Sequence, residues 1–171
     1  MRIVGIDGST NATGICLFEN GKYVKHTLID LHKIKDAYQR IPNMADEICK
    51  RINGVAPVDV IIMEKPIMKG GNVDTLQKLS NLAGAIMLYA YRHNVEFRHP
   101  LPGEWRKTVG LQQSNKIKRE VLKQEAIKAV ELEYGLIVSN DEAEAILIAR
   151  SGFDLPKIDV KAEDVEDDIW E

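Results

Sequence analysis

One short run of residues, VDVIIM at 58–63, constrains the possible fold more than any other part of the chain. The run is almost continuously apolar and rich in β-branched side chains, which is typical of a strand buried on both faces of its sheet. Such a strand needs helices on both sides, so we expect an α/β protein. Glu64 follows the run directly, and an acid at the end of a buried strand needs an explanation.

The first third of the chain predicts a β-meander followed by a helix. Asn20-Gly21 is a strong signal for a type I′ hairpin turn, because both central positions need positive φ. Pro42 indicates either a kink in the following helix or a later start at Asn43. The expected strands cover 2–7, 13–18 and 22–31, and the expected helix covers 37–54.

The remainder predicts further strands alternating with helices. We expect Asp74 to cap a helix that runs to Arg92, with Leu76, Leu79, Leu82, Ala83, Ile86, Met87 and Ala90 facing inward. Gly135 is the expected C-cap of a charged helix over Lys116–Tyr134. The other expected elements are a strand at 95–98, a short helix at 102–110 and a helix at 141–151 capped by Ser139 or Asn140. This order predicts a five-stranded mixed sheet, with three antiparallel and two parallel strands, flanked by helices.

Charge divides the 171 residues into two parts. Residues 154–171 hold eight acids and two bases, so they carry −6, and the net charge of −3 leaves +3 for the rest. We therefore expect a folded domain at 1–153 and an acidic tail at 154–171. The tail is either solvated and disordered or lays its apolar residues on the body. A mildly basic body hints at a polyanionic partner.

Composition excludes several classes of protein. No apolar window is long enough to span a membrane, and the N-terminus has no secretory h-region, so we expect a cytoplasmic protein. Cys16 and Cys49 are too few for a disulfide framework or a four-cysteine zinc site, and both are expected to be small buried residues. None of the four histidines has the spacing of a zinc ligand.

Four acids stand where a core element would normally carry none. Asp7 ends the first strand, Glu64 ends the fourth, and Asp141 and Glu144 share one face of the last helix. If the first and fourth strands are neighbours, all four carboxylates can meet at one edge of the sheet. Buried carboxylates repel each other, so we expect bound Mg²⁺ or Mn²⁺, which oxygen ligands favour. Two such ions can activate water for phosphodiester hydrolysis.

These acids also carry a family resemblance. Asp7 in IVGIDGSTNATGICLF, Glu64 in IIMEKPIM, and Asp141 and Glu144 in NDEAEAILIA resemble the RuvC Holliday junction resolvases of the RNase H-like superfamily, over residues 1 to about 151. Glu144 stands where the family commonly has Asp. The resemblance implies an RNase H-like fold, four metal ligands that are also catalytic, two Mg²⁺ ions per site, and a homodimer that resolves junctions by paired nicks with 5′-phosphate and 3′-hydroxyl ends.

The resemblance also suggests a substrate range and DNA-contacting residues. The sequence looks like the compact phage-encoded branch, which implies a bacterial host cytoplasm and roles in recombination and repair. It also implies other branched DNA as substrate, such as three-way junctions and forks. Ile67 and Met68 can wedge against an unpaired base. The basic residues expected to bind phosphate are Lys65, Lys69, Arg106, Lys107, Lys116, Lys118 and Arg119.

Alternative functions remain open on the sequence alone. DGSTNATG is similar to a phosphate-binding turn of sugar kinases and actin-like ATPases, but those need two such domains and this chain has room for one. A nuclease of the same fold that processes structured RNA is a second reading, and a catalytically silent DNA-binding module is a third. The four acids favour the resolvase. The apolar helix at 76–90, with Ala83-Gly84-Ala85, is the expected dimer interface.

Overall fold

A five-stranded mixed sheet forms the centre of the protein. The structure is a computed structural model, and it describes residues 1–68, 71–112, 117–161 and 165. The strands are β1 (Arg2–Asp7), β2 (Ala12–Glu19), β3 (Lys22–Asp30), β4 (Val60–Met63) and β5 (Glu96–Arg98), in the order β3-β2-β1-β4-β5. β1, β2 and β3 are antiparallel, and β4 and β5 continue the sheet in parallel with β1. The predicted strand pattern is therefore confirmed.

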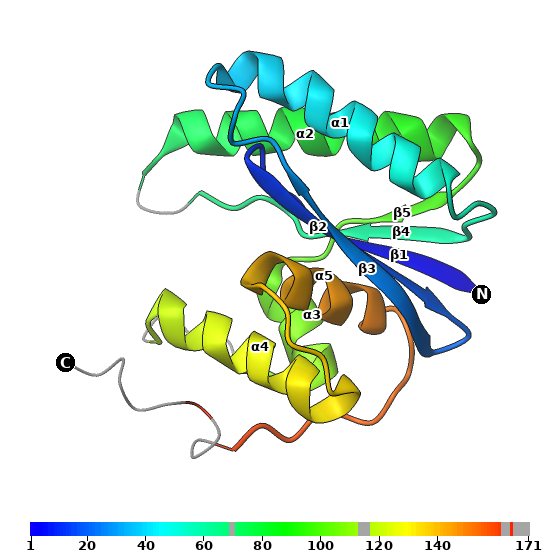
Figure 1. Ribbon diagram of the computed structural model, residues 1–171, viewed down its shortest axis with the longest axis vertical. Coiled ribbons are helices and arrows are strands. Elements are labelled where there is room, and N and C mark those ends of the chain that lie inside the picture. Colours follow the sequence, from blue (N-terminus) through cyan, green and yellow to red (C-terminus); the bar gives the residue numbers. More distant parts are fainter. Residues whose placement is uncertain (69–70, 113–116, 162–164, 166–171) are drawn as a thin grey trace.

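Helices cover both faces of the sheet (Figure 1). One layer holds α1 (Ala37–Asn53) and α2 (Val73–Arg92). The other holds α3 (Pro102–Val109), α4 (Arg119–Tyr134) and α5 (Asn140–Arg150). Each layer has its own apolar core, because alternate residues of β1 and β2 face opposite sides of the sheet. Within the described part of the chain, no helix combines the length and the apolar character needed to cross a bilayer.

Local sequence signals predicted most helix and strand ends. The structure corrects two predictions about helix starts and one about which α2 residues face inward. α1 begins at Ala37 with Asp36 as its N-cap, so Pro42 lies inside the helix and the later start at Asn43 is wrong. The proline is tolerated because it is exposed on the outer face, where water can reach the carbonyl that loses its donor. Asn72, rather than Asp74, caps α2 through its side chain, and Met87 of α2 is 46% exposed instead of inward.

One hairpin turn and two helix caps form at the predicted residues. Asn20 and Gly21 have φ values of 51° and 78°, which is the type I′ geometry that joins β2 to β3. Gly135 ends α4 in the left-handed region with a φ of 66°. Ser139 caps α5, and its side chain accepts from the Glu142 N–H.

Glycines in β1 and β2 let α5 pack directly on the sheet. A Cβ atom at Gly5 would lie 2.5 Å from the carbonyl oxygen of Ala145, and one at Gly14 would overlap the main-chain carbonyl of Asp141. No side chain could be accommodated at either position without moving the helix. The start of α5 is therefore held against the end of β1, because Gly14 pairs with Asp7 across the β1–β2 ladder.

Residues beyond the expected domain boundary at 153 continue to pack on the body. Ile158 is buried in the core on the α5 side, and its N–H donates to the carbonyl of Val109 at 2.8 Å. The buried guanidinium of Arg150 donates to the carbonyl of Pro156 at 2.6 Å. Val160 packs against the same core. Residues 154–160 thus cross the C-terminal end of α3. The other apolar tail residues Ile169 and Trp170 lie outside the described residues.

The contact between Gly14 and α5 generates a stability prediction. Gly14→Ala should lower the free energy of unfolding by about 1–3 kcal/mol or more, because overpacking against main-chain atoms cannot be relieved by rotating a side chain. Gly54→Ala is the matched control, since a Cβ there meets only ordinary contacts at 3.5 Å and φ is −68°. Urea unfolding measures both. Equal stability of the two variants would contradict the close approach.

Candidate active site

Two carboxylates lie at the ends of the adjacent strands β1 and β4. These strands are parallel neighbours, and Ile6 is paired with Met63 immediately before Asp7 and Glu64. The Glu64 N–H reaches the carbonyl of Ile6 at 3.4 Å, so the two acids leave the sheet at the same edge. The adjacency predicted from the strand order is what brings them together.

The other two carboxylates come from the first turns of α5. Asp141 and Glu144 lie one turn apart, and the packing of α5 on Gly14 sets them beside Asp7. The side chain of Asp7 hydrogen-bonds to that of Glu144. All four acids line one cleft and are partly buried. The structure thus gathers the four acids that the sequence singled out.

The electrostatics of the site centre on Asp7. Burial raises the pKa of the Asp7 carboxyl well above its usual value of 3.8, and the negative charges of Glu144, Glu64 and Asp141 raise that pKa further. The site therefore attracts positive charge, whether as a proton or as a cation.

Two donors on α3 contact Glu64 and Glu144. The indole Nε1–H of Trp105 donates to Glu64 Oε2 at 2.6 Å. Arg106 Nη1 lies 3.5 Å from Glu144 Oε1. The side-chain amide of Asn140 on α5 also donates to Asp141 Oδ1 at 3.3 Å and to Glu144 Oε2 at 3.5 Å. Sequence reasoning missed Trp105, because a contact between residues 41 positions apart leaves no local signal.

The donor set fits a hard divalent cation. It consists of carboxylate oxygens, and Asn140 adds a buried Oδ1 that finds no hydrogen-bond donor among the described residues. As the side chains stand, no group of three or more His, Cys, Asp or Glu within the described part of the chain is gathered closely enough to hold an ion. The acids have the right chemistry, and side-chain movement would be needed to draw them together.

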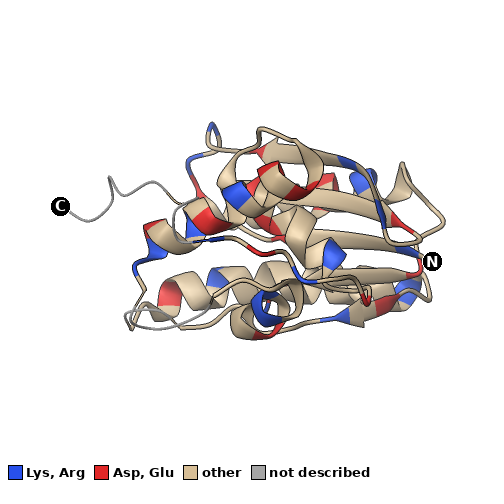
Figure 2. Ribbon diagram, turned by 90° about the horizontal axis from the view of Figure 1, so that it is seen from below, with Lys and Arg blue, Asp and Glu red and all other residues tan. Residues whose placement is uncertain are grey.

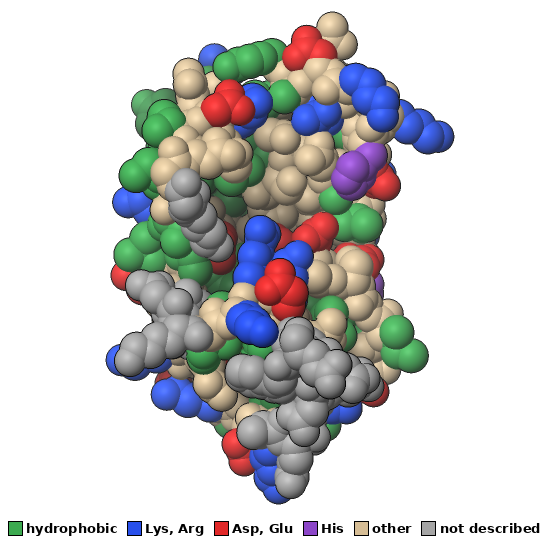
Figure 3. Space-filling view, turned by 90° about the vertical axis from the view of Figure 1, so that its left-hand side faces the viewer, with side chains coloured by type: hydrophobic (Ala, Val, Ile, Leu, Met, Phe, Trp, Pro, Cys, Tyr) green, Lys and Arg blue, Asp and Glu red, His purple; other side chains and the backbone are tan. Residues whose placement is uncertain are grey.

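Cationic side chains surround these acids in the cleft, which has a volume of about 610 Å³. Arg40, Lys78, Arg119 and Lys123 line it, and they come from the α1 and α2 layer and from α4. Arg40 Nε has no acceptor among the described residues. Figure 3 looks onto this end of the sheet and shows a hollow with basic and acidic side chains beside it. Arg40 and Lys78 were not expected here, because their contacts with the cleft depend on how the α1 and α2 layer packs.

The residues predicted to contact DNA divide into three groups. Lys65, Lys107, Lys118 and Arg119 are exposed, and so are Ile67 and Met68, which have exposed fractions of 38% and 58%. Lys69 and Lys116 lie outside the described residues. Arg106 is placed differently from the expectation, because it is 2% exposed and its guanidinium donates to the carbonyls of Gln112 and Leu122 and to Glu125. Its guanidinium is therefore largely occupied by protein acceptors, although the residue lines the cleft that holds the four acids.

The basic residues within the described part of the chain do not form a single continuous face. Figure 2 shows acidic and basic residues interspersed over the helices and strands. Attraction of a polyanion by the body as a whole is therefore weak, and the cations that line the cleft are better placed to bind one.

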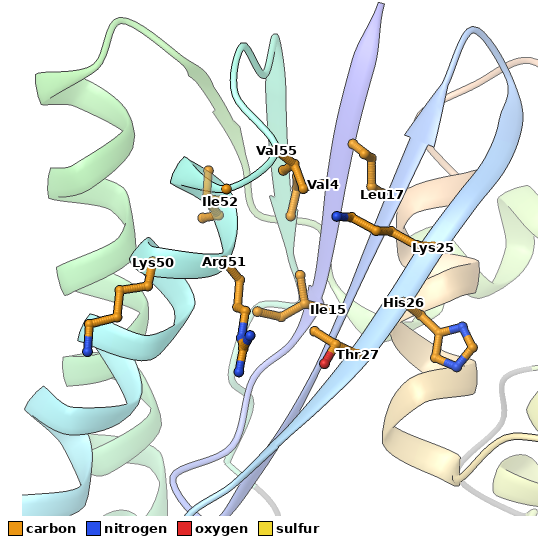
Figure 4. Close-up of a pocket in the computed structure, with 11 residues that line it drawn as sticks. Val4, Ile15, Leu17, Lys25, His26, Thr27, Lys50, Arg51, Ile52 and Val55 are labelled. Atoms are coloured by element: carbon orange, nitrogen blue, oxygen red, sulfur yellow. The ribbon is translucent and has the colours of Figure 1, made fainter.

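A second, smaller cavity of about 220 Å³ lies between α1 and the β2–β3 hairpin (Figure 4). Its floor is aliphatic, with Val4, Ile15, Leu17, Ile52 and Val55. Lys50 points away from it and pairs with Asp46 and Glu47 on α1. None of the four acids lines this cavity, so the candidate active site is the larger cleft at the ends of β1 and β4.

Comparison with solved structures places the fold among the RuvC resolvases. RuvC of Thermus thermophilus in complex with a Holliday junction substrate is 15% identical, with a TM-score of 0.69 over 88% of this chain and 91% of that chain. A second T. thermophilus RuvC structure is 16% identical, with a TM-score of 0.67 over 88% and 92%. The yeast mitochondrial Holliday junction resolvase is 17% identical, with a TM-score of 0.54 over 87% and 76%. No family model and no curated protein matches the sequence.

The chain therefore has the RNase H-like fold in its RuvC form. The similarity extends over 88% of this chain. The TM-scores establish the fold. At identities of 15–17% they establish nothing further, so the chemistry has to be argued from the site itself.

The repulsion around Asp7 predicts how stability depends on pH in metal-free buffer. Because the folded pKa of Asp7 is raised, its ionisation destabilises the folded state as pH rises from about 4 through the raised pKa. Asp7→Asn removes that ionisation, so it should raise the thermal midpoint at pH 7 in EDTA by about 2–4 °C for each kcal/mol relieved. The gain should vanish near pH 3, where the wild-type carboxyl is protonated. Differential scanning calorimetry measures both.

Asp46→Asn is the control for this prediction. Asp46 lies on the surface with its side chain 64% exposed and pairs with Lys50. Losing an exposed pair of this kind changes stability by at most about 1 kcal/mol. A destabilised Asp7→Asn at pH 7 in EDTA would contradict the repulsion described for the cluster.

Proposed function

We propose that this protein is a metal-dependent DNA endonuclease that resolves Holliday junctions and other branched DNA. The observation that carries the proposal is the meeting of Asp7, Glu64, Asp141 and Glu144 in one cleft of a RuvC-type fold. One of the RuvC structures of this fold is bound to a Holliday junction substrate, which supports branched DNA as the substrate class. Four acids in a cleft that is also lined by cations favour a phosphodiester-cleaving enzyme over a binding module without catalytic activity.

Each of the four acids has a place in the proposed mechanism. Asp7, Glu64, Asp141 and Glu144 would hold Mg²⁺, two ions per site, with Mn²⁺ as a substitute. When bound, the ions supply the Lewis acidity that activates water and stabilises the leaving oxygen, giving 5′-phosphate and 3′-hydroxyl ends. Bound cations would lower the raised pKa of Asp7, because the negative charges of Glu144, Glu64 and Asp141 are among its causes. Arg40 and Lys78 line the same cleft and would orient the phosphate next to the acids.

The DNA strands would approach along the rim of the cleft. We propose phosphate contacts for Lys65, Lys107, Lys118 and Arg119, and a wedging role for Ile67 and Met68 beside the junction centre. Arg106 is left out of this set because its guanidinium is enclosed. As the sequence resemblance implies, we also place the enzyme with the compact phage-encoded resolvases that act in a host cytoplasm.

One experiment tests the reaction class. Labelled four-way junction, three-way junction, linear duplex and a structured RNA are incubated with the protein in Mg²⁺ or in EDTA. We expect cleavage of branched DNA in Mg²⁺ only, with nicks that a ligase can reseal. Cleavage of the RNA alone would favour the RNA-processing alternative, and binding without any cleavage would favour a silent module.

Asp7→Asn should abolish cleavage of the four-way junction and preserve its binding. The variant removes a charge that serves the metal ions, while the cations that contact phosphate are untouched. Gel-shift titration measures binding in EDTA, and cleavage is followed in Mg²⁺, with Asp46→Asn as the active control. Retained cleavage by Asp7→Asn would refute the proposed site.

A homodimer would explain paired nicks, because a four-way junction presents two equivalent strands. α2 presents an apolar face away from the core, with Leu88 48% and Tyr91 82% exposed. Gly84 of the same helix would meet nothing within 4 Å if it carried a Cβ, so another helix could approach closely there. We propose α2 as the interface between two copies.

Leu88→Glu should convert the dimer into a monomer and uncouple the two nicks, since a charge would be buried between the copies. Leu132→Glu is the matched control, because Leu132 is 50% exposed on α4, which belongs to the other layer. Sedimentation velocity at micromolar concentration measures the oligomeric state. A wild-type protein that sediments only as a monomer would exclude this interface in the free protein.

A further inference from the structure

The two donors on α3 reach different members of the acid cluster, although they are consecutive in sequence. Trp105 Nε1–H donates to Glu64 Oε2 at 2.6 Å, and Arg106 Nη1 lies 3.5 Å from Glu144 Oε1. Glu64 comes from the end of β4 and Glu144 from α5, so one short helix is linked to both elements that carry the acids.

Arg106 is held by groups outside the acid cluster, and Trp105 is buried beside it. Arg106 is 2% exposed, and Glu125 and the carbonyls of Gln112 and Leu122 accept its N–H groups at 2.8–2.9 Å. Its guanidinium carbon lies 5.2 Å from the centre of the Trp105 ring, an attractive cation–π geometry. Trp105 is also 2% exposed.

α3 itself is fixed at both ends. Pro102 opens the helix, and the Glu104 side chain accepts from the Leu101 N–H. At the other end Gly110 is left-handed, with a φ of 99°, and Ile158 donates to the carbonyl of Val109. The helix therefore does not depend on the acids for its position, and it can hold a geometry that the acids would not adopt by themselves.

Carboxylates that repel one another turn outward unless donors hold them. A buried indole N–H needs a partner, and a carboxylate that accepts from it loses rotational freedom. A guanidinium beside Glu144 also offsets part of the charge of the cluster, although Glu125 neutralises much of its own charge. Groups that orient ligands in this way typically change metal affinity by about 10–100-fold when they are removed.

We propose that Trp105 and Arg106 are positioning residues, with the indole N–H fixing Glu64 and the guanidinium orienting Glu144 for the cations of the proposed nuclease. This inference rests on the proposed function. It assigns α3 a task separate from binding DNA, namely to set the direction of two carboxylates before any metal arrives.

The first test observes the hydrogen bond without changing the core. The chain has two tryptophans, so in a Trp170→Phe background Trp105 supplies the one indole N–H signal in a ¹H–¹⁵N spectrum. We expect that signal to exchange slowly with solvent, to shift in Glu64→Gln, and to shift again when Mg²⁺ is added. An indole N–H chemical shift that is the same in Glu64→Gln as in the background protein would contradict the hydrogen bond between Trp105 and Glu64.

The second test measures metal binding directly. Trp105→Phe should weaken Mg²⁺ binding by about 10-fold or more in calorimetry. It should leave four-way junction binding in EDTA unchanged, and cleavage should largely recover at saturating Mg²⁺. Tyr134→Phe is the matched control, because it removes one polar group, a partner of Arg150, on the same side of the sheet. Thermal melting of both variants confirms that they fold.

Arg106 is tested together with its buried partner. Replacing Arg106 and Glu125 simultaneously by Met avoids leaving one buried charge unpaired. We expect this double variant to fold and to bind Mg²⁺ more weakly than wild type, again by about 10-fold. Mg²⁺ affinity equal to wild type in this variant and in Trp105→Phe would overturn the inference.

These outcomes separate the inference from the proposed function. If wild type binds Mg²⁺ and cleaves junctions while both sets of variants match it, the nuclease proposal stands and the positioning role fails. If neither wild type nor Asp7→Asn binds Mg²⁺ or cleaves junctions, the proposed function itself fails.

Discussion

The direct packing of α5 on β1 and β2 is the contact on which the rest of the site depends. Gly5 and Gly14 leave room for main-chain atoms of α5 where any side chain would collide. Because Gly14 is opposite Asp7 in the ladder, this contact sets the first turns of α5 beside the end of β1. Two elements more than a hundred residues apart in sequence are thereby brought to carboxylate–carboxylate contact.

That proximity has an electrostatic cost, which the protein does not eliminate. Burial raises the pKa of Asp7, and the charges of the other three acids raise it further. The nearest buried cation, Arg106, is shared with Glu125. A cluster of partly buried like charges is unfavourable for stability and favourable for capturing cations, which is the compromise expected of an active site.

The layer of α3, α4 and α5 links this site to residues near the end of the chain. Ile158 holds the C-terminal end of α3 through a main-chain hydrogen bond, and Arg150 holds the carbonyl of Pro156. α3 in turn carries the two donors that contact the acids. Residues that composition alone assigned to a solvated tail therefore take part in the packing that supports the cleft, because Ile158 contributes apolar surface to the same core as Trp105.

The sequence by itself determined the elements and the positions of the four acids, because β-branched runs, an Asn-Gly turn and helix caps act over a few residues. The strand order then followed from chain connectivity. Only the tertiary structure decided the surroundings of those acids. Arg106 and Lys107 are neighbours in one short helix, and their sequence context predicts the same basic surface for both. Packing against α4 encloses the first with Glu125 and leaves the second in solvent, because burial depends on contacts between residues distant in sequence, such as the 41 positions from Glu64 to Trp105.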